Sequence, residues 1–331
     1  MPMFSVVIPT YNRQEHLQRA LDSVFAQQFD DYEVIVVDDG STDDTRCMLA
    51  ELGEKVRTIH QENSGPSVAR NAGVRLASGK YVVFLDSDDR WYPWTLQVFA
   101  RVAADYGYPG WLYGGYVSAN DRTSVNLEEG RKIAATHFAD YATAAQEDGL
   151  MPLPSGVAMS RELFLEMAGF CNDLPVAEDI DLWFRVGPVT DFVRVDAPPL
   201  YERDANSGNL SVDIGRSYAG ILEIVKRERH HVYVGSGAWQ FTRRAIITRQ
   251  LLQYAHIYRM KRDVRRAARF YLEVFRFQLQ SGFREPSFGG RRNRFLLNFP
   301  IILACPELYR RLRSVVADPQ GAADSGHIDR G

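Results

Sequence analysis

The sequence predicts an α/β protein with a mainly parallel sheet that has helices on both faces, followed by a basic helical extension. Apolar runs of strand length alternate with amphipathic helical stripes over the first hundred residues. Strands that alternate with helices form parallel sheets through crossover connections. From about residue 215 the chain becomes rich in Lys and Arg and keeps a helical periodicity.

Each apolar run ends at a polar turn, and most helical stripes lie between two such runs. The predicted strands cover residues 4–8, 33–37, 56–59, 80–85, 111–116, 157–160, 192–195 and 199–201. The predicted helices cover residues 14–26, 43–52 with Thr42 as N-cap, 66–78, 93–106, 161–168, 179–186, 239–258 and 264–279. Residues 118–149 have no clean period, and we expect a loop or lid shaped by a substrate there.

Composition narrows the class of protein further. The hydrophobic content of 45% and the charged content of 24% are ordinary for a globular chain. Three cysteines without a CxxC pair argue against a disulfide framework or a structural zinc site. The first strand begins at about Phe4, which leaves no room for a signal peptide, and no run of 18 apolar residues could span a bilayer. These features predict a cytoplasmic protein.

Charge divides the chain into parts. Residues 1–214 carry a formal net charge of −16, whereas residues 215–314 carry +15. We therefore expect a catalytic domain over residues 1–214 and a basic helical extension over residues 215–316. Residues 317–331 have the composition of a disordered tail.

The extension contains an apolar run, residues 295–305, with three arginines on either side. This pattern suits the surface of an anionic membrane, which would place the protein on the inner face of the cell membrane. The alternative is a helix that packs on the acidic domain or on a second copy in a homo-oligomer. Nucleic acid is disfavoured as a partner, because the arginines alternate with helix-core positions.

Polar residues follow the predicted strands where ligands bind in an open α/β sheet. The turn after the first strand, PTYNR, is too bulky for the glycine-rich turn of a dinucleotide site. After the second strand, Asp38 and Asp39 could either bind a ribose or base or simply cap a turn. After the fourth strand, Asp86 and Asp88 share one face while the chain stays extended, with Ser87 pointing away. Such a carboxylate pair suits Mg²⁺ or Mn²⁺, and the alternative is an acidic turn in which Asp89 begins the next element.

Two further positions carry candidate chemistry. Arg70 lies one turn inside a predicted helix, where its guanidinium could reach a phosphate or base, or remain solvated. Glu178 and Asp179 open the later EDIDLW helix. A carboxylate there could cap the helix or serve as a rigidly held general base.

As an ordered set these motifs resemble inverting glycosyltransferases of family 2, which have the GT-A fold. The resemblance covers about residues 3–205 and rests on five motifs: PTYNR, VVDDGSTDDT, NSGPSVARNAG, GKYVVFLDSDD and EDIDLW. It implies a nucleotide-sugar-binding half over residues 1–110 and an acceptor-binding half over residues 111–214. It also implies a UDP-, GDP- or dTDP-sugar donor and a glycan or lipid-linked acceptor, as in surface polysaccharide or glycoconjugate synthesis.

The resemblance implies roles for particular residues. The donor would be bound by Pro9, Thr10, Tyr11, Asp39, Arg70, Asp86 and Ser87. A divalent metal would be held by Asp88 first and Asp86 second. Asp179 would be the catalytic base, with Glu178 beside it. The chain departs from many relatives in having no histidine in the segment from Tyr201 to Asn206, and it lacks the QxxRW motif of processive enzymes.

These residues predict a single displacement with inversion, in which a metal neutralises the leaving diphosphate and a carboxylate takes the acceptor proton. The alternative is a non-catalytic sugar-nucleotide-binding subunit with the same fold. Intact acidic motifs argue against that alternative. A nucleotidyltransferase is a third hypothesis, but it needs a Gly-rich basic loop where this chain has PTYNR.

Overall fold

The computed structural model describes residues 1–119, 132–174, 176–204 and 214–280. It divides into two compact units, Met1–Arg244 and Ala245–Gly331, each described by itself below. The apolar run at residues 295–305, the predicted tail at residues 317–331 and part of the predicted lid, residues 120–131, lie outside the described residues. The expected boundary at residue 214 stays a prediction.

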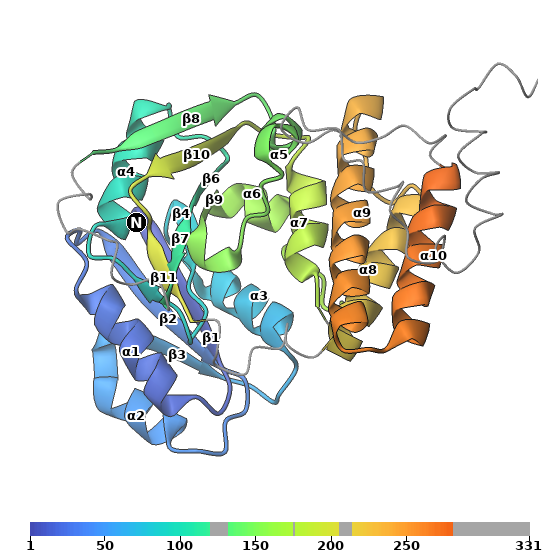
Figure 1. Ribbon diagram of the computed structural model, residues 1–331. Helices are drawn as coiled ribbons and strands as arrows, with labels where there is room; N and C mark the ends of the chain where they lie inside the picture. Colours follow the sequence, from blue (N-terminus) through green and yellow to red (C-terminus); the bar gives the residue numbers. More distant parts are fainter. Residues whose placement is uncertain (120–131, 175, 205–213, 281–331) are drawn as a thin grey trace, which may run out of the picture. The chain divides into compact units, whose positions relative to one another are not determined.

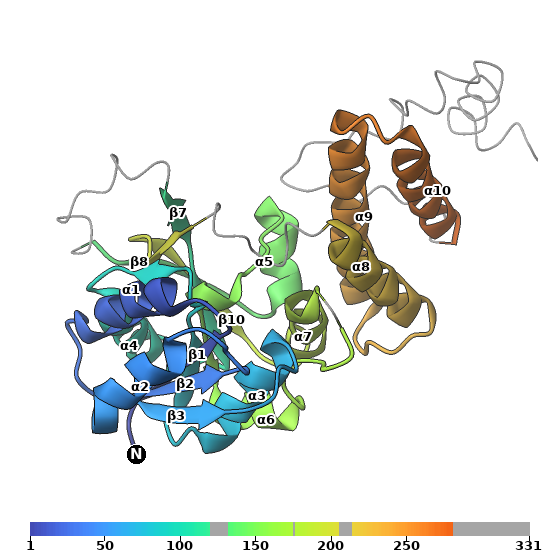
Figure 2. The same ribbon diagram turned by 90° about the horizontal axis from the view of Figure 1, so that it is seen from below.

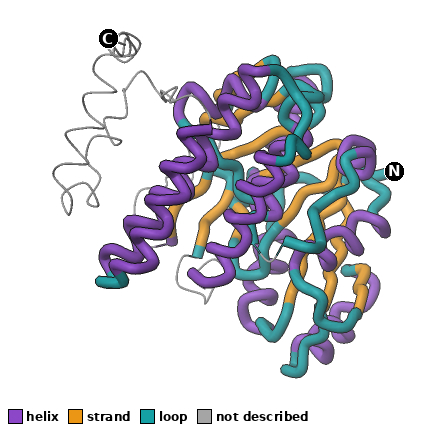
Figure 3. The backbone as a smooth tube through the Cα atoms, turned by 90° about the vertical axis from the view of Figure 1, so that its right-hand side faces the viewer, coloured by secondary structure: helices purple, strands orange, loops and turns teal. Residues whose placement is uncertain are grey.

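The first unit is built on an eight-stranded sheet with the order β3-β2-β1-β4-β9-β6-β10-β8. Its strands are β1 Phe4–Thr10, β2 Tyr32–Asp38, β3 Arg57–His60, β4 Tyr81–Phe84, β6 Trp111–Gly114, β8 Ala134–Phe138, β9 Val157–Ser160 and β10 Phe192–Ala197. The pairs β3-β2, β2-β1, β1-β4 and β6-β10 are parallel, whereas β9 and β8 run antiparallel to their neighbours. Figure 2 shows β1, β2 and β3 side by side, and Figure 3 shows the strands in orange. The predicted mainly parallel sheet is confirmed.

Helices cover both faces of this sheet. The first unit contains α1 Gln14–Phe25, α2 Thr45–Leu52, α3 Pro66–Leu76, α4 Thr95–Asp105, α5 Tyr141–Asp148, α6 Arg161–Glu166, α7 Glu178–Val186 and α8 Ile214–Arg229, with short 3-10 turns at Gly53–Lys55 and Pro154–Gly156. In Figure 1, α1 and α4 lie on one side of the sheet and α3 and α6 on the other. A second sheet, with the order β5-β11-β7, joins β5 Arg90–Trp91, β11 Tyr201–Arg203 and β7 Tyr116–Ser118.

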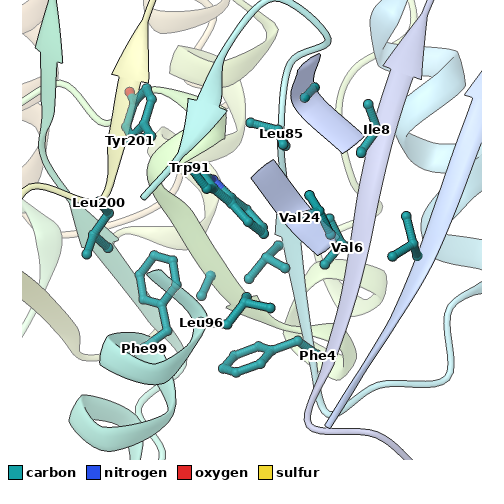
Figure 4. Close-up of a cluster of buried hydrophobic side chains, with 14 of the residues drawn as sticks. Phe4, Val6, Ile8, Val24, Leu85, Trp91, Leu96, Phe99, Leu200 and Tyr201 are labelled. Carbon is teal, nitrogen blue, oxygen red and sulfur yellow. The ribbon is translucent and has the colours of Figure 1, made fainter. Parts of the chain in front are cut away.

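The alternation of side chains along β1 explains both helical layers. Phe4, Val6 and Ile8 belong to the apolar cluster with α1 and α4, and all three are fully buried (Figure 4). Val7 points to the other face, where a Cβ on Gly73 of α3 would lie 2.4 Å from its Cγ1. Burying a side chain of this size contributes about 1.5–3 kcal/mol, so both layers hold β1 in place.

Two predictions about local structure were wrong. The segment expected to be an irregular lid contains strand β8 and helix α5, which starts at an N-cap where Asp140 accepts a 2.8 Å hydrogen bond from the Thr143 amide. The helix is short, and its periodicity gives little sequence signal. Thr42 does not cap α2, because its amide and hydroxyl both donate to the Asn12 side chain.

The basic extension begins in the first unit with α8. Helix α9, Gly237–Met260, continues into the second unit, and α10, Val264–Gln280, follows a tight turn. Within the second unit the Phe270 ring stacks on Tyr254 and Tyr258 at 5.7 and 5.5 Å. The helix pair is therefore confirmed. Among the described residues, no helix is both long and apolar enough to cross a membrane.

Candidate active site

A cleft of about 810 Å³ opens at the carboxyl ends of β1, β2 and β4. All ten predicted site residues line it: Pro9, Thr10, Tyr11, Asp39, Arg70, Asp86, Ser87, Asp88, Glu178 and Asp179. In all, six carboxyl side chains and three guanidinium groups face this cleft. The sheet thus brings together residues that are far apart in the sequence.

Asp39 fixes the wall of the cleft that follows β2. Its carboxylate accepts hydrogen bonds from the Gln61 side chain at 2.7 Å and from the amides of Ser64 and Gly65 at 2.9 and 2.8 Å. The turn that follows Asp39 needs a glycine at position 40, because the φ of Gly40 is +84° and a Cβ there would lie 2.9 Å from the Asn63 backbone nitrogen. An ionised carboxylate has about four acceptor sites, so Asp39 can hold this loop and still bind a ligand.

The turn after β1 lies against the same wall. Asn12 has a φ of 50°, a conformation that asparagine tolerates, and its amide donates to the Ser41 hydroxyl at 2.9 Å. Beside it, the Thr10 hydroxyl is buried and has no hydrogen-bond partner among the described residues. A buried hydroxyl without a partner costs free energy, which a ligand in the cleft can recover.

The turn after β4 differs from the expected extended chain. The Asp89 amide donates to the Asp86 carbonyl at 2.9 Å, so residues 86–89 form a turn, although Asp86 and Asp88 still both face the cleft. Asp89 does more than begin the next element. It accepts a 2.6 Å hydrogen bond from the Ser155 hydroxyl, which in turn accepts from the Asp86 amide. Burial, together with the charge of Asp86, raises the pKa of Asp89 to about 8.

Arg70 joins the two sides of the cleft. It lies one turn into α3, is 5% exposed, and its guanidinium is 5.2 Å from the centre of the Phe170 ring. One nitrogen, Nη2, is 2.6 Å from Asp86 and the other, Nη1, is 2.9 Å from Glu178. A planar guanidinium can bridge two carboxylates in this way, whereas an ammonium has no such fork.

The start of α7 holds the predicted catalytic base. Ala177 has a φ of 71°, which is uncommon for a residue with a side chain, and it sets the direction in which the helix begins. Asp179 follows and accepts a hydrogen bond from the Ile180 amide. Burial raises the pKa of Asp179 to about 7, and the neighbouring Glu178 carboxylate adds to the shift.

The donor set fits a divalent cation that is shared with a substrate. Within the described part of the chain, no group of three or more His, Cys, Asp or Glu side chains is arranged to hold a metal alone. Mg²⁺ commonly takes one or two carboxylates and completes its shell with phosphate oxygens and water. Asp86 and Asp88 could supply those carboxylates, and substrate phosphates would supply the rest.

Three further residues line the cleft or contact its lining, and the sequence predicted no role for them. Arg13, the last residue of the PTYNR motif, pairs with Asp88 at 2.6 Å. Ser155 supports the turn after β4 from a distant segment, and nothing near it in the sequence indicates this contact. Arg203 lies on β11 and faces the cleft, with its guanidinium 5.6 Å from the Tyr116 ring centre. Of the three, Arg13 carried a signal, since it belongs to the polar turn after the first strand.

Residues 5–165 match the family model described as "Glycosyl transferase family 2". Residues 5–165 therefore form a glycosyltransferase family 2 domain. A glucosyltransferase of Campylobacter jejuni, named as acting on GalNAc(5)-diNAcBac-PP-undecaprenol, is 29% identical over 236 residues, which is 68% of this chain and 74% of the relative. An uncharacterised Nostoc glycosyltransferase is 36% identical over 168 residues, covering 48% of this chain and 51% of the relative.

Solved structures share the fold of this chain. Staphylococcus aureus TarS 1–349 in complex with UDP-GlcNAc aligns with a TM-score of 0.56 and 21% identity, over 76% of this chain and 72% of TarS. The Pyrobaculum calidifontis mannosyltransferase PcManGT, in complex with GDP-Man and Mn²⁺, aligns with a TM-score of 0.56 and 20% identity, over 96% and 84%. The predicted GT-A fold is therefore confirmed. The chain spans between 27% and 51% of the length of several Rickettsia and Nostoc relatives.

Proposed function

We propose that this chain is a metal-dependent, inverting glycosyltransferase. It transfers a sugar from a UDP-, GDP- or dTDP-sugar to a hydroxyl of a glycan or lipid-linked acceptor, in surface polysaccharide or glycoconjugate synthesis. The observation that carries the proposal is that one cleft holds Asp39, Arg70, Asp86 and Asp88 together with a carboxyl group, Asp179, whose pKa is about 7. A general base works best when its pKa lies near the working pH.

Each side of the cleft has its own task in this proposal. Thr10 and Asp39 bind the nucleoside, since the first offers an unpaired hydroxyl and the second a fixed carboxylate. Arg70 holds Asp86 in place beneath the diphosphate and holds Glu178 beside the base. A divalent metal on Asp88 and Asp86 would supply Lewis-acid neutralisation of the leaving diphosphate.

Asp179 takes the proton of the acceptor hydroxyl as that oxygen attacks the anomeric carbon. The attack comes from the side opposite the diphosphate, which leaves with its bonding electron pair, so the configuration at carbon inverts. A positioned base of this kind contributes about 10²–10⁴-fold to the rate. Asp179 and the Asp86–Asp88 turn line the same cleft, which supports a base and a leaving-group site around one sugar.

The comparisons support the choice of substrates. One structural neighbour is described with UDP-GlcNAc and another with GDP-Man and Mn²⁺. The Campylobacter relative is named for an undecaprenol-linked acceptor, and a Bacillus subtilis relative, 43% identical over 94 residues, is named as a putative teichuronic acid biosynthesis enzyme.

The test is a panel of UDP-, GDP- and dTDP-sugars with Mn²⁺, followed by thermal unfolding and donor hydrolysis. One donor class should raise the melting temperature, because a ligand at 100 times its Kd adds about 2.7 kcal/mol of stability. Chelation of the metal by EDTA should abolish hydrolysis. Asp88→Asn should raise the Mn²⁺ concentration needed for half-maximal hydrolysis. Failure of every donor to bind or turn over would contradict the proposal.

We also propose contact with an anionic membrane through residues 295–305 and the arginines that flank them. The proposal rests on the sequence pattern, since these residues lie outside the described part of the chain. The full chain should co-sediment with vesicles that contain anionic lipid. The triple substitution of Arg291, Arg292 and Arg294 to Gln should reduce binding by about 1 kcal/mol for each charge removed.

A further inference from the structure

The two carboxylates assigned to the metal have partners of different kinds. Asp86 pairs with Arg70, whose side chain is 6% exposed and which is also bound to Glu178. Asp88 pairs with Arg13, whose side chain is 23% exposed. Arg70 is held by two carboxylates and by the Phe170 ring, so it cannot leave without breaking buried contacts. The Arg13 side chain is the more exposed of the two, so displacing it from its carboxylate breaks a less buried contact.

The backbone around Arg13 is fixed even though its side chain is partly exposed. The Asn12 side chain accepts from the Thr42 amide at 2.6 Å, and the Arg13 carbonyl accepts from the Leu17 amide at 2.9 Å in the first turn of α1. The Arg13 side chain therefore extends into the cleft from a fixed turn. Rotation about its side-chain bonds is enough to move the guanidinium to another partner.

We propose that Arg13 and a divalent cation compete for Asp88, so that Arg13 sets how tightly the free protein binds metal. The Nη1 of Arg13 lies 2.6 Å from Oδ2 of Asp88, within the contact distance of a charge-assisted hydrogen bond. A cation that approaches Asp88 must displace this guanidinium or lie beside a like charge. The displaced Arg13 still faces the cleft, where a substrate diphosphate would accept it.

This inference rests on the proposed function only in taking a divalent cation as the ligand of Asp88. It concerns Arg13, which lies outside the acidic motif. Arg13 weakens metal binding by the free protein, whereas a metal ligand strengthens it. Removing Arg13 should strengthen metal binding, whereas removing a residue that helps to hold metal should weaken it. The sign of the change therefore tests the assignment.

The experiment measures Mn²⁺ affinity of the full chain without donor, from the electron paramagnetic resonance signal of free Mn²⁺. Arg13→Gln should bind Mn²⁺ about tenfold more tightly than the wild type, a typical coupling between two competing ligands. Arg13→Lys keeps a positive charge near Asp88 and should bind Mn²⁺ less tightly than Arg13→Gln does. The matched control is Arg57→Gln, which removes the exposed 2.8 Å pair with Glu33 at a site outside the cleft and should change nothing.

A double substitution tests whether the effect of Arg13 on Mn²⁺ affinity depends on Asp88. In the Asp88→Asn background, Arg13→Gln should no longer tighten Mn²⁺ binding, since the shared partner is gone. Equal or weaker binding by Arg13→Gln, tightening that persists without Asp88, or no Mn²⁺ binding by either protein would each overturn the inference. Because transfer is not measured, a chain that transfers sugar without this effect refutes only the role of Arg13. A chain that shows the effect but turns over no donor refutes only the proposed function.

Discussion

The first turn of α7 presents carboxylates to two different environments. Asp179 faces the cleft and accepts a hydrogen bond from the Ile180 amide. Two residues later, Asp181 is 1% exposed and accepts two hydrogen bonds from Arg185, one from Arg227 and one from the Tyr233 hydroxyl. Both carboxylates belong to the same EDID sequence, yet their partners differ completely.

This difference in partners separates a carboxylate available for chemistry, Asp179, from a carboxylate that stabilises the structure, Asp181. Two arginines and a tyrosine donate four hydrogen bonds to Asp181, and those from Arg227 and Tyr233 tie α7 to α8 and the loop that follows it. Asp179 lies in a less polar setting that raises its pKa to about 7, mainly through burial. At the start of this helix, the number of hydrogen bonds that a carboxylate already accepts indicates whether it can react. Its position in the helix does not.

The largest expected effect is that of Asp179→Asn. An amide cannot take the acceptor proton, so the transfer rate should fall by about 10²–10⁴-fold, the usual contribution of a general base. The donor Kd should stay unchanged, as measured by calorimetry. Asp173→Asn, on an exposed residue before the same helix, is the control and should retain full activity. Transfer by Asp179→Asn near the wild-type rate would remove Asp179 from its proposed role.

The pH dependence tests the same residue in the unchanged protein. Asp179 acts as a base only when it is deprotonated, and its raised pKa of about 7 means that this form is lost as the pH falls. The rate with bound donor should therefore drop about tenfold for each pH unit below 7 and level off above it. A rate that stays level down to pH 5, with donor binding intact, would show that another group takes the proton.

Asp181→Asn should act on stability. Its loss leaves Arg185 and Arg227 without their shared charge at a buried site, which should lower the free energy of unfolding by about 2 kcal/mol. Urea unfolding measures this difference. The control is Asp105→Asn, which removes a surface pair with Arg101 and should cost below about 0.5 kcal/mol. Equal effects of the two substitutions would mean that the Asp181 network does not hold α7.

The sheet and the cleft could be predicted from the sequence because both follow from local order. Apolar runs predict the strands, and the carboxyl ends of parallel strands meet at one edge, so the motifs after β1, β2 and β4 had to converge. Asp179 could be placed near them only through resemblance, since its helix begins far along the chain. The structure adds the pairing of Arg70 with both Asp86 and Glu178, separated from it by 16 and 108 residues.

The parts that could not be predicted depend on contacts between distant segments. Asp88 and its partner Arg13 are 75 residues apart in the sequence. Asp89 is bound by Ser155, which lies 66 residues further along the chain. Asp181 looks like an ordinary acidic residue of a first helical turn. Its partners Arg227 and Tyr233 lie 46 and 52 residues later, and no local sequence pattern predicts these contacts.

The smallest predicted effect distinguishes the two carboxylates most directly. Tyr233→Phe removes one 2.8 Å hydrogen bond to Asp181 and keeps the buried ring, so the free energy of unfolding should fall by about 1 kcal/mol. Tyr106→Phe, which loses an exposed 2.9 Å bond to the Ala135 carbonyl, should have a smaller effect in the same urea titration. Tyr233 does not line the cleft, so the transfer rate of the folded variant should equal that of the wild type. A fall in rate with unchanged stability would mean that the contacts of Asp181 adjust the position of Asp179, and that the two faces of α7 do not act separately.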